Sequence, residues 1–273
     1  MSLDPRLTPM RGDIALAGWE DRVDAQSFVP GVARAVVAPV LDLRSEREAT
    51  GLATQLIYGE IFNVFEVRDG LALGQSKTDG YVGYVSADGL GDPVASNGTV
   101  TALFAQLYPE PSIKSVPMGI VPWQSIVRVS GDGPFAAMSN GYLCRQHLNG
   151  VATDWVAEAG RLLGAPYLWG GRSPFGLDCS ALVQLALAAL GVAAPRDSDM
   201  QMDALGDMLP DSAELKRGDL IFWKGHVGIM EDADTLLHAT AHWMAVVREP
   251  LAPAIARIAA AGDGPVLARK RIS

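Results

Sequence analysis

The first half of the chain alternates apolar and polar residues with the period of β-strands. Runs such as VARAVVAPVLDLR, TQLIYGEIFNVFEV and GYVGYVS fill the stretch from Val32 to about Leu90, with turn-forming residues between them. A second, shorter β-rich stretch covers residues 116–148. Each stretch has a Gly-Tyr element near its end, DGYVGYV at 79–85 and NGYLC at 140–144. This faint repeat predicts two small β-barrels in tandem, with generic β-rich sequence as the simpler alternative.

After Gly150 the pattern changes to helical spacing and long apolar runs. The segment TDWVAEAGRLLG, residues 153–164, has the period of a helix, with Asp154 as its N-cap. A loop rich in glycine and proline, YLWGGRSPFGLD, follows. The next run, CSALVQLALAAL, is apolar on nearly all sides. It predicts a buried helix over Cys179–Leu190, which Gly191 ends.

The rest of the chain returns to strands. Residues 217–247 contain apolar runs with tight turns between them and predict three consecutive strands. A helix-like IARIAAAG and a strand-like VLARKRI complete the sequence. The change of character near residue 150 indicates a domain boundary there. The predicted parts are an N-terminal extension at 1–30, two small β domains at 31–91 and 92–150, and an α+β domain at 151–273.

Composition and charge narrow the class of protein. The 273 residues are 49% hydrophobic and 19% charged, which provides enough apolar surface for sizeable cores. A net charge of −9 argues against nucleic acid as a partner, because phosphate binding needs clustered lysine and arginine. Charged residues break every apolar run of the N-terminal MSLDPRLTPMRGDIALAG, so it indicates neither a signal peptide nor a membrane segment. We therefore expect a cytoplasmic protein, or a periplasmic one if a leader has been removed.

The two cysteines, Cys144 and Cys179, are too few for a disulfide framework. Cys179 lies in the first turn of the predicted buried helix, with Asp178 as the N-cap. Unpaired N–H groups and the helix dipole favour a thiolate there and lower the pKa of the thiol. The Asp178 carboxylate opposes this, so full activation needs a cationic partner. A small apolar residue at a helix start is the simpler interpretation, but the glycine-rich loop favours a functional Cys179. Cys144 is expected to pack in the second barrel.

Two histidines flank a predicted turn at residues 231–234. If Met230 pairs with Asp234 around a three-residue loop, His226 lies directly opposite His238, with Cβ atoms about 4.5–5.5 Å apart. One imidazole can then act as a base while the other accepts its far N–H and fixes its tautomer. Two solvent-facing histidines on a hairpin are the simpler alternative.

A zinc site is the main alternative to a catalytic arrangement of these residues. Cys179, His226 and His238 are possible zinc ligands that would leave an open position, and His242 shares a strand face with His238. The sequence has no short paired motif such as HxxxH on a helix, and a cysteine at a helix start suits a nucleophile. We therefore expect neither a metal nor another cofactor, and His242 and His147 are assigned no role.

The motifs YLWGG, LDCSALVQ, RDSDMQ, RGDLIFW, HVGIM and LLHAT, in this order, closely resemble the NlpC-type cell-wall cysteine peptidases. The resemblance covers about residues 151–245, with Ala181 where the family usually has glycine. It implies a papain-like fold and hydrolysis of peptidoglycan peptides, characteristically at γ-D-glutamyl bonds. It also implies Cys179 as nucleophile, His226 as general base and His238 as the third, polar member.

One tyrosine in the loop before the helix also has a counterpart in this family. Tyr167 matches the tyrosine whose hydroxyl helps to stabilise the oxyanion, together with backbone N–H groups at the helix start. A packed loop aromatic is the simpler interpretation of Tyr167. Trp169 is expected to pack rather than to take part in the chemistry.

The two β-rich stretches resemble bacterial SH3-type domains. The expected fold class is therefore α+β, a papain-like NlpC-type catalytic domain preceded by two small SH3-like β-barrels. This combination resembles the γ-D-glutamyl-L-diamino-acid endopeptidases that recycle muropeptides. Their substrates carry an N-terminal L-Ala with a free amine, because the first barrel closes one end of the cleft.

That resemblance also implies a pocket for the free amine of the substrate. Asp178 would pair with the ammonium, and an unpaired buried charge would then reject a blocked amine. Further residues expected to line the site are Ser180, Arg196 and Ser198. The first barrel would add one tyrosine, Tyr81 or Tyr84, and one carboxylate, Glu48 or Glu60; the sequence does not choose between them. The simpler interpretations are a solvated loop for Arg196 and Ser198 and a turn residue for Glu60.

The leading hypothesis is a γ-D-glutamyl-L-diamino-acid endopeptidase whose partners are peptidoglycan-derived peptides. A second hypothesis keeps the fold but changes the reaction to acyl transfer or another amidase reaction. A third is a non-catalytic wall-binding protein with a silent peptidase domain, against which the intact Cys179, His226 and His238 argue. No membrane insertion is expected, and the sequence leaves the diamino acid and the oligomeric state open.

Overall fold

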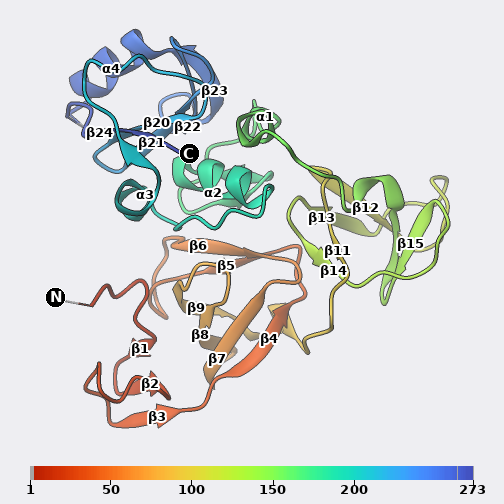
Figure 1. Cartoon of the computed structure of the whole chain (residues 1–273). Helices are drawn as coiled ribbons and strands as arrows, with labels where there is room; N and C mark the ends of the chain where they lie inside the picture. The colour runs from red at the N-terminus through yellow and green to blue at the C-terminus, as the bar shows by residue number, and fades with distance from the viewer. Residues whose placement is uncertain (1–2, 263, 273) are drawn as a thin grey trace. The chain divides into compact units, whose positions relative to one another are not determined.

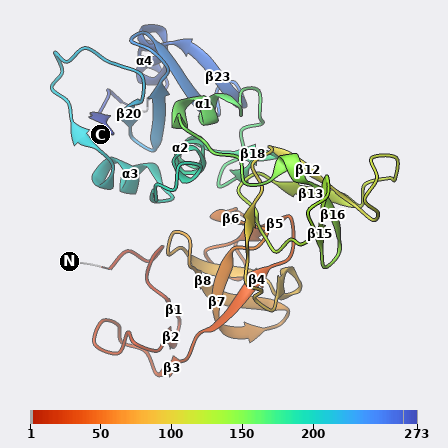
Figure 2. The ribbon, with the colours of Figure 1, turned by 45° about the vertical axis from the view of Figure 1, so that its right-hand side comes forward.

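The structure of the protein is a computed structural model that describes residues 3–262 and 264–272. The chain folds as two compact units, Met1–Gly150 and Val151–Ser273. The architecture is mixed α+β and mostly sheet, and the α-helices of the described residues belong to the second unit (Figures 1 and 2). Among those residues, no helix has both the length and the apolar composition needed to cross a membrane.

A five-stranded antiparallel sheet forms the centre of the first unit, in the order β10-β4-β7-β8-β9. Its strands are β4 Val32–Val36, β7 Ile61–Arg68, β8 Leu71–Ser76, β9 Val82–Ser86 and β10 Leu90–Gly91. A two-stranded ladder of β5 Val40–Leu43 and β6 Thr54–Ile57 accompanies it. The inward side chains, among them Leu43, Leu56 and Phe62, form one buried apolar cluster. The alternating pattern therefore predicted strands correctly over this stretch.

The N-terminal extension is folded onto this sheet. It forms the short strands β1 Met10–Arg11, β2 Ile14–Leu16 and β3 Ser27–Val29. Apolar side chains from β2 and β3 pack against a second cluster on β7, β8 and β9, which includes Phe65 and Leu73. Strands of two or three residues are too short to produce a detectable alternation, so the sequence did not predict them.

The second β-rich stretch has a sheet of its own, in the order β13-β12-β16-β15. Its strands are β12 Phe104–Tyr108, β13 Gly119–Pro122, β15 Phe135–Met138 and β16 Gly141–Cys144, with a further ladder of β11 Gly98–Thr99 and β14 Ile126–Val127. Both β9 and β16 run into a 3-10 turn followed by a leucine, Ala87–Gly89 with Leu90 and Arg145–His147 with Leu148. The two Gly-Tyr elements thus lead into the same local structure, as the faint repeat predicts.

A six-stranded sheet in the order β19-β24-β20-β21-β22-β23 organises the second unit. Its strands are β19 Asp207–Met208, β20 Asp219–Trp223, β21 His226–Met230, β22 Thr235–Thr240, β23 Ala245–Pro250 and β24 Ala268–Arg271. A separate hairpin of β17 Arg172–Ser173 and β18 Gly176–Leu177 precedes it in the chain. The predicted run of three strands is confirmed, and a fourth, β23, extends it.

The first two helices have the sequence signals that the pattern predicts. Helix α1, Trp155–Gly160, begins at Asp154, whose carboxylate accepts the N–H groups of Val156 and Ala157. Helix α2, Cys179–Ala188, is buried from its first residue to Leu187 and packs against α1, β21 and β22. Gly191 follows it with φ +75°, a conformation that favours glycine at a helix end.

The last two helices are α3 Ser198–Ala204 and α4 Leu251–Ala260. Leu251, Ala254 and Ile258 of α4 cover one face of the sheet and pack with Ile221 and Met230. Helix α4 begins earlier than the helix-like segment IARIAAAG. This is possible because Pro253 lies in its first turn, where a missing N–H costs no hydrogen bond.

Asp219 ties the last strand to the sheet, and its removal is expected to destabilise the second unit. Its carboxylate is fully buried and accepts two bonds from Arg271, both of 2.7 Å, and one from the backbone N–H of Lys216. We expect Asp219→Ala to lower the free energy of unfolding in urea by about 2–3 kcal/mol, because the Arg271 guanidinium and the N–H of Lys216 lose a charged acceptor. Asp207→Ala, at an exposed position that also faces Arg271, is the control and should cost less than about 0.5 kcal/mol. Equal losses in both variants would contradict the assignment.

Candidate active site

A tight hairpin precedes Cys179 and places it at the start of a buried helix. Strands β17 and β18 fold back on each other, and the N–H of Asp178 bonds the carbonyl of Gly171 at 3.2 Å. Asp178 then caps α2 by accepting the N–H of Ala181 at 2.9 Å. Cys179 is therefore in the first helical turn, as predicted, and only 6% of it is exposed.

The sulfur of Cys179 lies against the backbone on both sides of His226. Its Sγ is 4.0 Å from the carbonyl oxygen of Gly225, and the N–H of Val227 also interacts with it. Because α2 packs on β21, the helix start and the first residue of that strand meet here. The predicted nucleophile and the predicted base are thus neighbours in space although they are far apart in sequence.

Burial dominates the acidity of the Cys179 thiol. It raises the pKa of the thiol from 9.0 to about 12, and the Asp178 carboxylate acts in the same direction. The N–H groups of Val227 and Ser180 and the charge of Arg196 lower the pKa, but by less. The expectation of a lowered pKa at the helix start is therefore wrong for the resting protein. The thiol is neutral, and a base must take its proton when it reacts.

Two rings on neighbouring strands flank the His226 ring. Nε2 of His226 is 2.8 Å from Nδ1 of His238, and the two ring centroids are 5.1 Å apart. On the other side, Trp223 lies opposite His226 in the β20–β21 ladder, with ring centroids 5.5 Å apart. His226 is half-buried and His238 fully buried. The neighbouring rings leave the His226 imidazole little freedom to rotate.

The predicted hairpin register was wrong by two residues, but the predicted strand face was right. Met230 pairs with Leu236, not with Asp234, because Asp232 caps a longer turn by accepting the N–H groups of Asp234 and Thr235. His226 and His238 are therefore diagonal neighbours rather than directly opposite residues. A shift of two keeps both side chains on one face, and long side chains reach across such a diagonal.

Two charged residues that the sequence analysis did not identify continue this row. Nε2 of His238 is 2.7 Å from Oε1 of Glu249 on β23, and the same oxygen pairs with Arg257 on α4. The β22–β23 ladder places Glu249 opposite Leu236, one diagonal step from His238. The alternation in the segment AVVREP was the only available signal, and it does not say which strand lies beside β23.

Burial keeps His238 uncharged. It lowers the pKa of His238 from 6.5 to about 3, and the positive charge of Arg257 acts in the same direction. His238 is therefore neutral at physiological pH, with one ring nitrogen that donates and one that accepts.

Tyr167 lies near the sulfur. Its backbone N–H bonds the carbonyl of Met244 at 2.9 Å, which ties the loop before α2 to the turn after β22. Burial raises the pKa of the Tyr167 hydroxyl above its usual value of 10, and negative charge on the neighbouring Asp178, or on Cys179 once it ionises, acts in the same direction. The hydroxyl therefore keeps its proton and can donate a hydrogen bond throughout the neutral range.

The Asp178 carboxylate is the centre of a buried polar network. Arg196 binds it with two parallel bonds of 2.7 and 2.9 Å, and only 1% of Arg196 is exposed. Ser180 Oγ and the N–H of Gly170 also donate to it, at 3.1 and 3.0 Å. Arg196 further donates to Gly171 O at 3.1 Å. The alternative of a solvated loop is therefore wrong for Arg196.

This network bears on the predicted amine pocket. Together with the cap bond from Ala181, the Asp178 carboxylate accepts five hydrogen bonds, and Arg196 already balances its charge. A substrate ammonium would have to share the carboxylate with Arg196. Ser198, the first residue of α3, is 9% exposed and lies close in sequence to Arg196.

The candidate residues of the first unit differ in their surroundings. Glu60 is buried and stabilises its own turn. Its carboxylate accepts hydrogen bonds from the N–H of Ile57 and the hydroxyl of Thr78. Glu48 is exposed. Tyr81 belongs to the buried apolar cluster, and Tyr84, also buried, carries the Arg47 guanidinium 5.1 Å from its ring centroid. Their part in the amine pocket stays a prediction.

The zinc alternative gains no support from the geometry. The described residues include no group of three or more His, Cys, Asp or Glu side chains arranged to hold a metal ion. His226 and His238 bind each other through ring nitrogens that a shared metal would need. His242 is exposed and packs edge-on against Trp243 instead.

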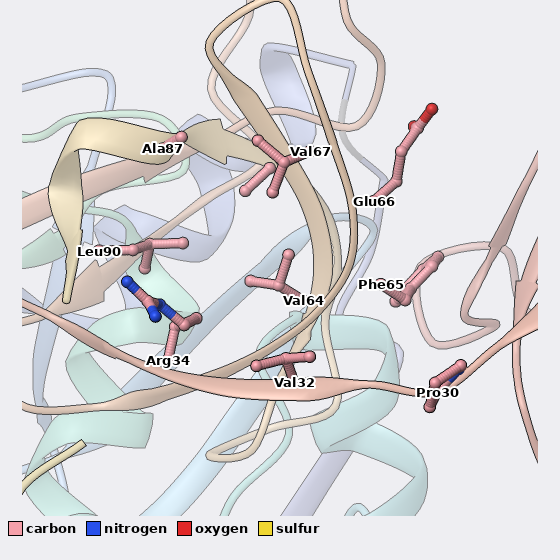
Figure 3. Close-up of a pocket in the computed structure, with 10 residues that line it drawn as sticks. Pro30, Val32, Arg34, Val64, Phe65, Glu66, Val67, Ala87 and Leu90 are labelled. Carbon is pink, nitrogen blue, oxygen red and sulfur yellow. The ribbon is translucent and has the colours of Figure 1, made fainter. Parts of the chain in front are cut away.

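A separate hollow of about 460 Å³ lies on the first unit, beside β4 and β7 (Figure 3). Its walls are mainly apolar, and its charged lining residues are Arg34 and Glu66. Arg34 pairs with Asp92 at 2.7 Å and Glu66 with Arg47 at 3.0 Å. The charges are thus balanced within the unit, and none of the predicted catalytic residues lines this hollow.

Comparison with known proteins agrees with this geometry. Residues 164–254 match the NlpC/P60 family, and residues 43–90 match the bacterial dipeptidyl-peptidase SH3 domain. The first match contains Cys179, His226, His238 and Glu249. The chain thus carries an NlpC/P60 domain, the cysteine peptidase family that the motifs resembled, together with a bacterial SH3 domain.

Individual relatives cover parts of the chain. A γ-D-glutamyl-L-lysine dipeptidyl-peptidase of Bacillus subtilis is 39% identical over 98 residues, 33% of this chain and 32% of the relative. The peptidoglycan endopeptidase RipB of Mycobacterium tuberculosis is 43% identical over 81 residues, 25% of this chain and 33% of the relative. The chain therefore spans about a third of the length of these relatives.

One solved structure extends the likeness across most of the chain. An NlpC/P60 family protein from Bacillus cereus superposes with a TM-score of 0.70 at 20% sequence identity, covering 88% of this chain and 99% of the other. At this identity the likeness concerns the fold. It supports the α+β arrangement of an NlpC/P60 domain with an SH3-like N-terminal part.

The neutrality of His238 makes the stability of the protein depend on pH. An unfolded histidine binds a proton near pH 6.5, whereas folded His238 does so only near pH 3. The stabilisation is complete above pH 6.5 and is lost as the pH falls toward 3, because the unfolded state then binds more protons. We expect His238→Gln to lose unfolding free energy less steeply than the wild type between pH 6.5 and 4, measured in urea. His242→Gln, at an exposed site, is the control and should keep the wild-type slope.

Proposed function

We propose that this chain is a cysteine peptidase that hydrolyses the γ-D-glutamyl–diamino acid bond of peptidoglycan peptides. The observation that carries the proposal is the position of the Cys179 sulfur against the backbone of residues 225–227, beside a base that is held by a second imidazole. The names of the relatives, a dipeptidyl-peptidase and a peptidoglycan endopeptidase, support the same class of reaction.

The proposed reaction begins with a proton transfer. Because the thiol is neutral, His226 takes its proton as Sγ attacks the scissile carbonyl, and a thiolate exists only as the bond forms. The negative charge on the carbonyl oxygen is stabilised by the Tyr167 hydroxyl and by N–H groups of the first turn of α2. His226 then gives the proton to the leaving amine. Water hydrolyses the thioester, again with His226 as base.

The proposed substrate is a muropeptide that begins L-Ala-γ-D-Glu-diamino acid and has a free amine on L-Ala, as in cell-wall recycling. The dipeptidyl-peptidase SH3 match at residues 43–90 supports this choice, because it belongs to proteins named for releasing a dipeptide. Within the second unit the available carboxylate is Asp178, shared with Arg196.

Replacing the nucleophile tests the reaction. We expect Cys179→Ala to lower kcat on L-Ala-γ-D-Glu-diamino acid peptides by about 10⁴-fold or more, because no other group forms the thioester. Cys144→Ala, which removes the second thiol, is the matched control and should keep wild-type activity. Mass spectrometry of the products should show L-Ala-D-Glu and a free diamino-acid peptide. Near-wild-type hydrolysis by Cys179→Ala, or transfer of the acyl group to an acceptor other than water, would refute the assignment.

Blocking the amine tests the substrate. We expect N-acetylation of L-Ala to lower kcat/KM by roughly 10²- to 10⁴-fold, because a desolvated carboxylate would lose its cation. Acetylating instead the side-chain amine of a lysine in the third position is the control, since that amine lies beyond the scissile bond. Equal turnover of the free and N-terminally acetylated peptides would exclude the amine pocket while leaving the peptidase reaction intact.

A further inference from the structure

Four side chains form one continuous row from the predicted base to the surface of α4. His226 on β21 contacts His238 on β22, which contacts Glu249 on β23, which pairs with Arg257 on α4. Two of these contacts join ring nitrogens whose donor and acceptor roles depend on where the protons lie. The pair of Glu249 and Arg257 determines which ring nitrogens donate and which accept.

The direction of the hydrogen bonds follows from the chemistry of Arg257. A guanidinium has N–H donors and no acceptor, so the Oε1 atom of Glu249 must accept from it. The same oxygen lies 2.7 Å from Nε2 of His238. Because an ionised carboxylate only accepts, Nε2 of His238 must carry the proton and donate.

The protons on the two rings then follow in order. A neutral imidazole with a proton on Nε2 has its lone pair on Nδ1, so His238 Nδ1 accepts at the 2.8 Å contact. The donor must be Nε2 of His226. The lone pair of His226 therefore lies on Nδ1, the one ring nitrogen that His238 does not engage.

We propose that Glu249 and Arg257 are positioning residues which fix the proton on Nε2 of both histidines and so keep Nδ1 of His226 available as the base. This inference rests on the proposed peptidase function for its consequence, though not for its proton positions. It adds two positioning residues to the Cys179, His226 and His238 set that the family resemblance implied.

Glu249 and Arg257 have opposite effects on the protonation of His238. A lone carboxylate beside His238 would favour the imidazolium, in which both nitrogens donate. His226 Nε2 would then have to accept, and its proton would move to Nδ1 and block the base. Arg257 balances the carboxylate and opposes a positive charge on His238, in agreement with the lowered pKa of that residue. Glu249 selects the tautomer, and Arg257 prevents a second proton.

The surroundings of the His226–His238 pair contain few other ionisable groups that could take over this role. Among the described residues, Glu249 from β23 contacts the pair and Arg257 from α4 acts on His238 through its charge. Cys179 from α2 lies against the backbone of residues 225–227, and Tyr167 from the loop before α2 lies near Cys179. The other Glu–Arg pair close by, Glu231 with Arg248, has no contact with either histidine among the described hydrogen bonds.

Nitrogen-15 NMR of protein labelled in its histidines tests the proton positions without any substrate. At pH 7 we expect both His226 and His238 to show a protonated Nε2 and an unprotonated Nδ1, and His238 to stay neutral down to about pH 4. Single His→Gln variants assign the signals. A proton on Nδ1 of His238 in the wild type would overturn the inference whatever the enzyme hydrolyses.

Two variants test the roles of the charges. Glu249→Gln, whose amide can donate as well as accept, should give mixed His238 tautomers and lower kcat by about 10- to 100-fold, less than a wrong tautomer at a residue that contacts the base directly. The acidic limb of kcat/KM should move to lower pH, because the imidazolium loses a stabilising charge. Arg257→Gln should move the same limb to higher pH. Glu231→Gln removes the negative charge of the other Glu–Arg pair. It should change neither kcat nor the acidic limb of kcat/KM.

The outcomes separate the two proposals. The inference is supported if both histidines carry their proton on Nε2 and if the acidic limb of kcat/KM shifts in opposite directions in Glu249→Gln and Arg257→Gln. Unchanged tautomers and an unchanged pH profile in Glu249→Gln overturn it, as do shifts of the same sign in both variants. If Glu249→Gln does not fold, Arg257→Gln and the wild-type spectrum decide alone. Predicted tautomers without hydrolysis of any peptidoglycan peptide would contradict the proposed function only.

Discussion

The ring-to-ring hydrogen bond between His226 and His238 is the contact on which the candidate site depends. It holds the first imidazole against the second, and it is possible only because both side chains lie on one face of adjacent strands. Trp223 on the third strand confines the same ring from the other side. Without this contact, Cys179 would still be a buried, neutral thiol at a helix start, and the His226 ring would lack the partner that holds it.

Burial explains why the charged residues of the candidate site occur in pairs. The low-dielectric surroundings that suppress the thiolate also strengthen each charged contact. Asp178 and Arg196 are therefore found as a bidentate pair, and Glu249 and Arg257 as a second pair, with little exposure for the buried members. Each pair balances a carboxylate next to a group whose protonation matters. The first adjoins the proposed nucleophile, and the second adjoins the ring that orients the proposed base.

The fold was largely predictable because its signals are local. Most of the longer strands of the first unit show their alternation, and Asp154 and Asp178 are effective helix caps. A nearly all-apolar run such as ALVQLALAAL, between a cap and a glycine, favours a buried helix. The strands of the N-terminal extension were missed because they are two or three residues long. The hairpin register was missed because Asp232 makes a longer turn than the shortest loop that fits the sequence.

By itself, the sequence determined which residue types carry the chemistry and on which face of each element they lie, since period and parity are properties of the chain. It placed Cys179 at a helix start and put His226 and His238 on one face. Only the tertiary structure decided which elements are neighbours, and therefore that Arg196 pairs with Asp178 and Glu249 with His238. Such pairs join residues from separate elements. Their energies depend on burial and distance, and neither exists until the sheet and helices have packed.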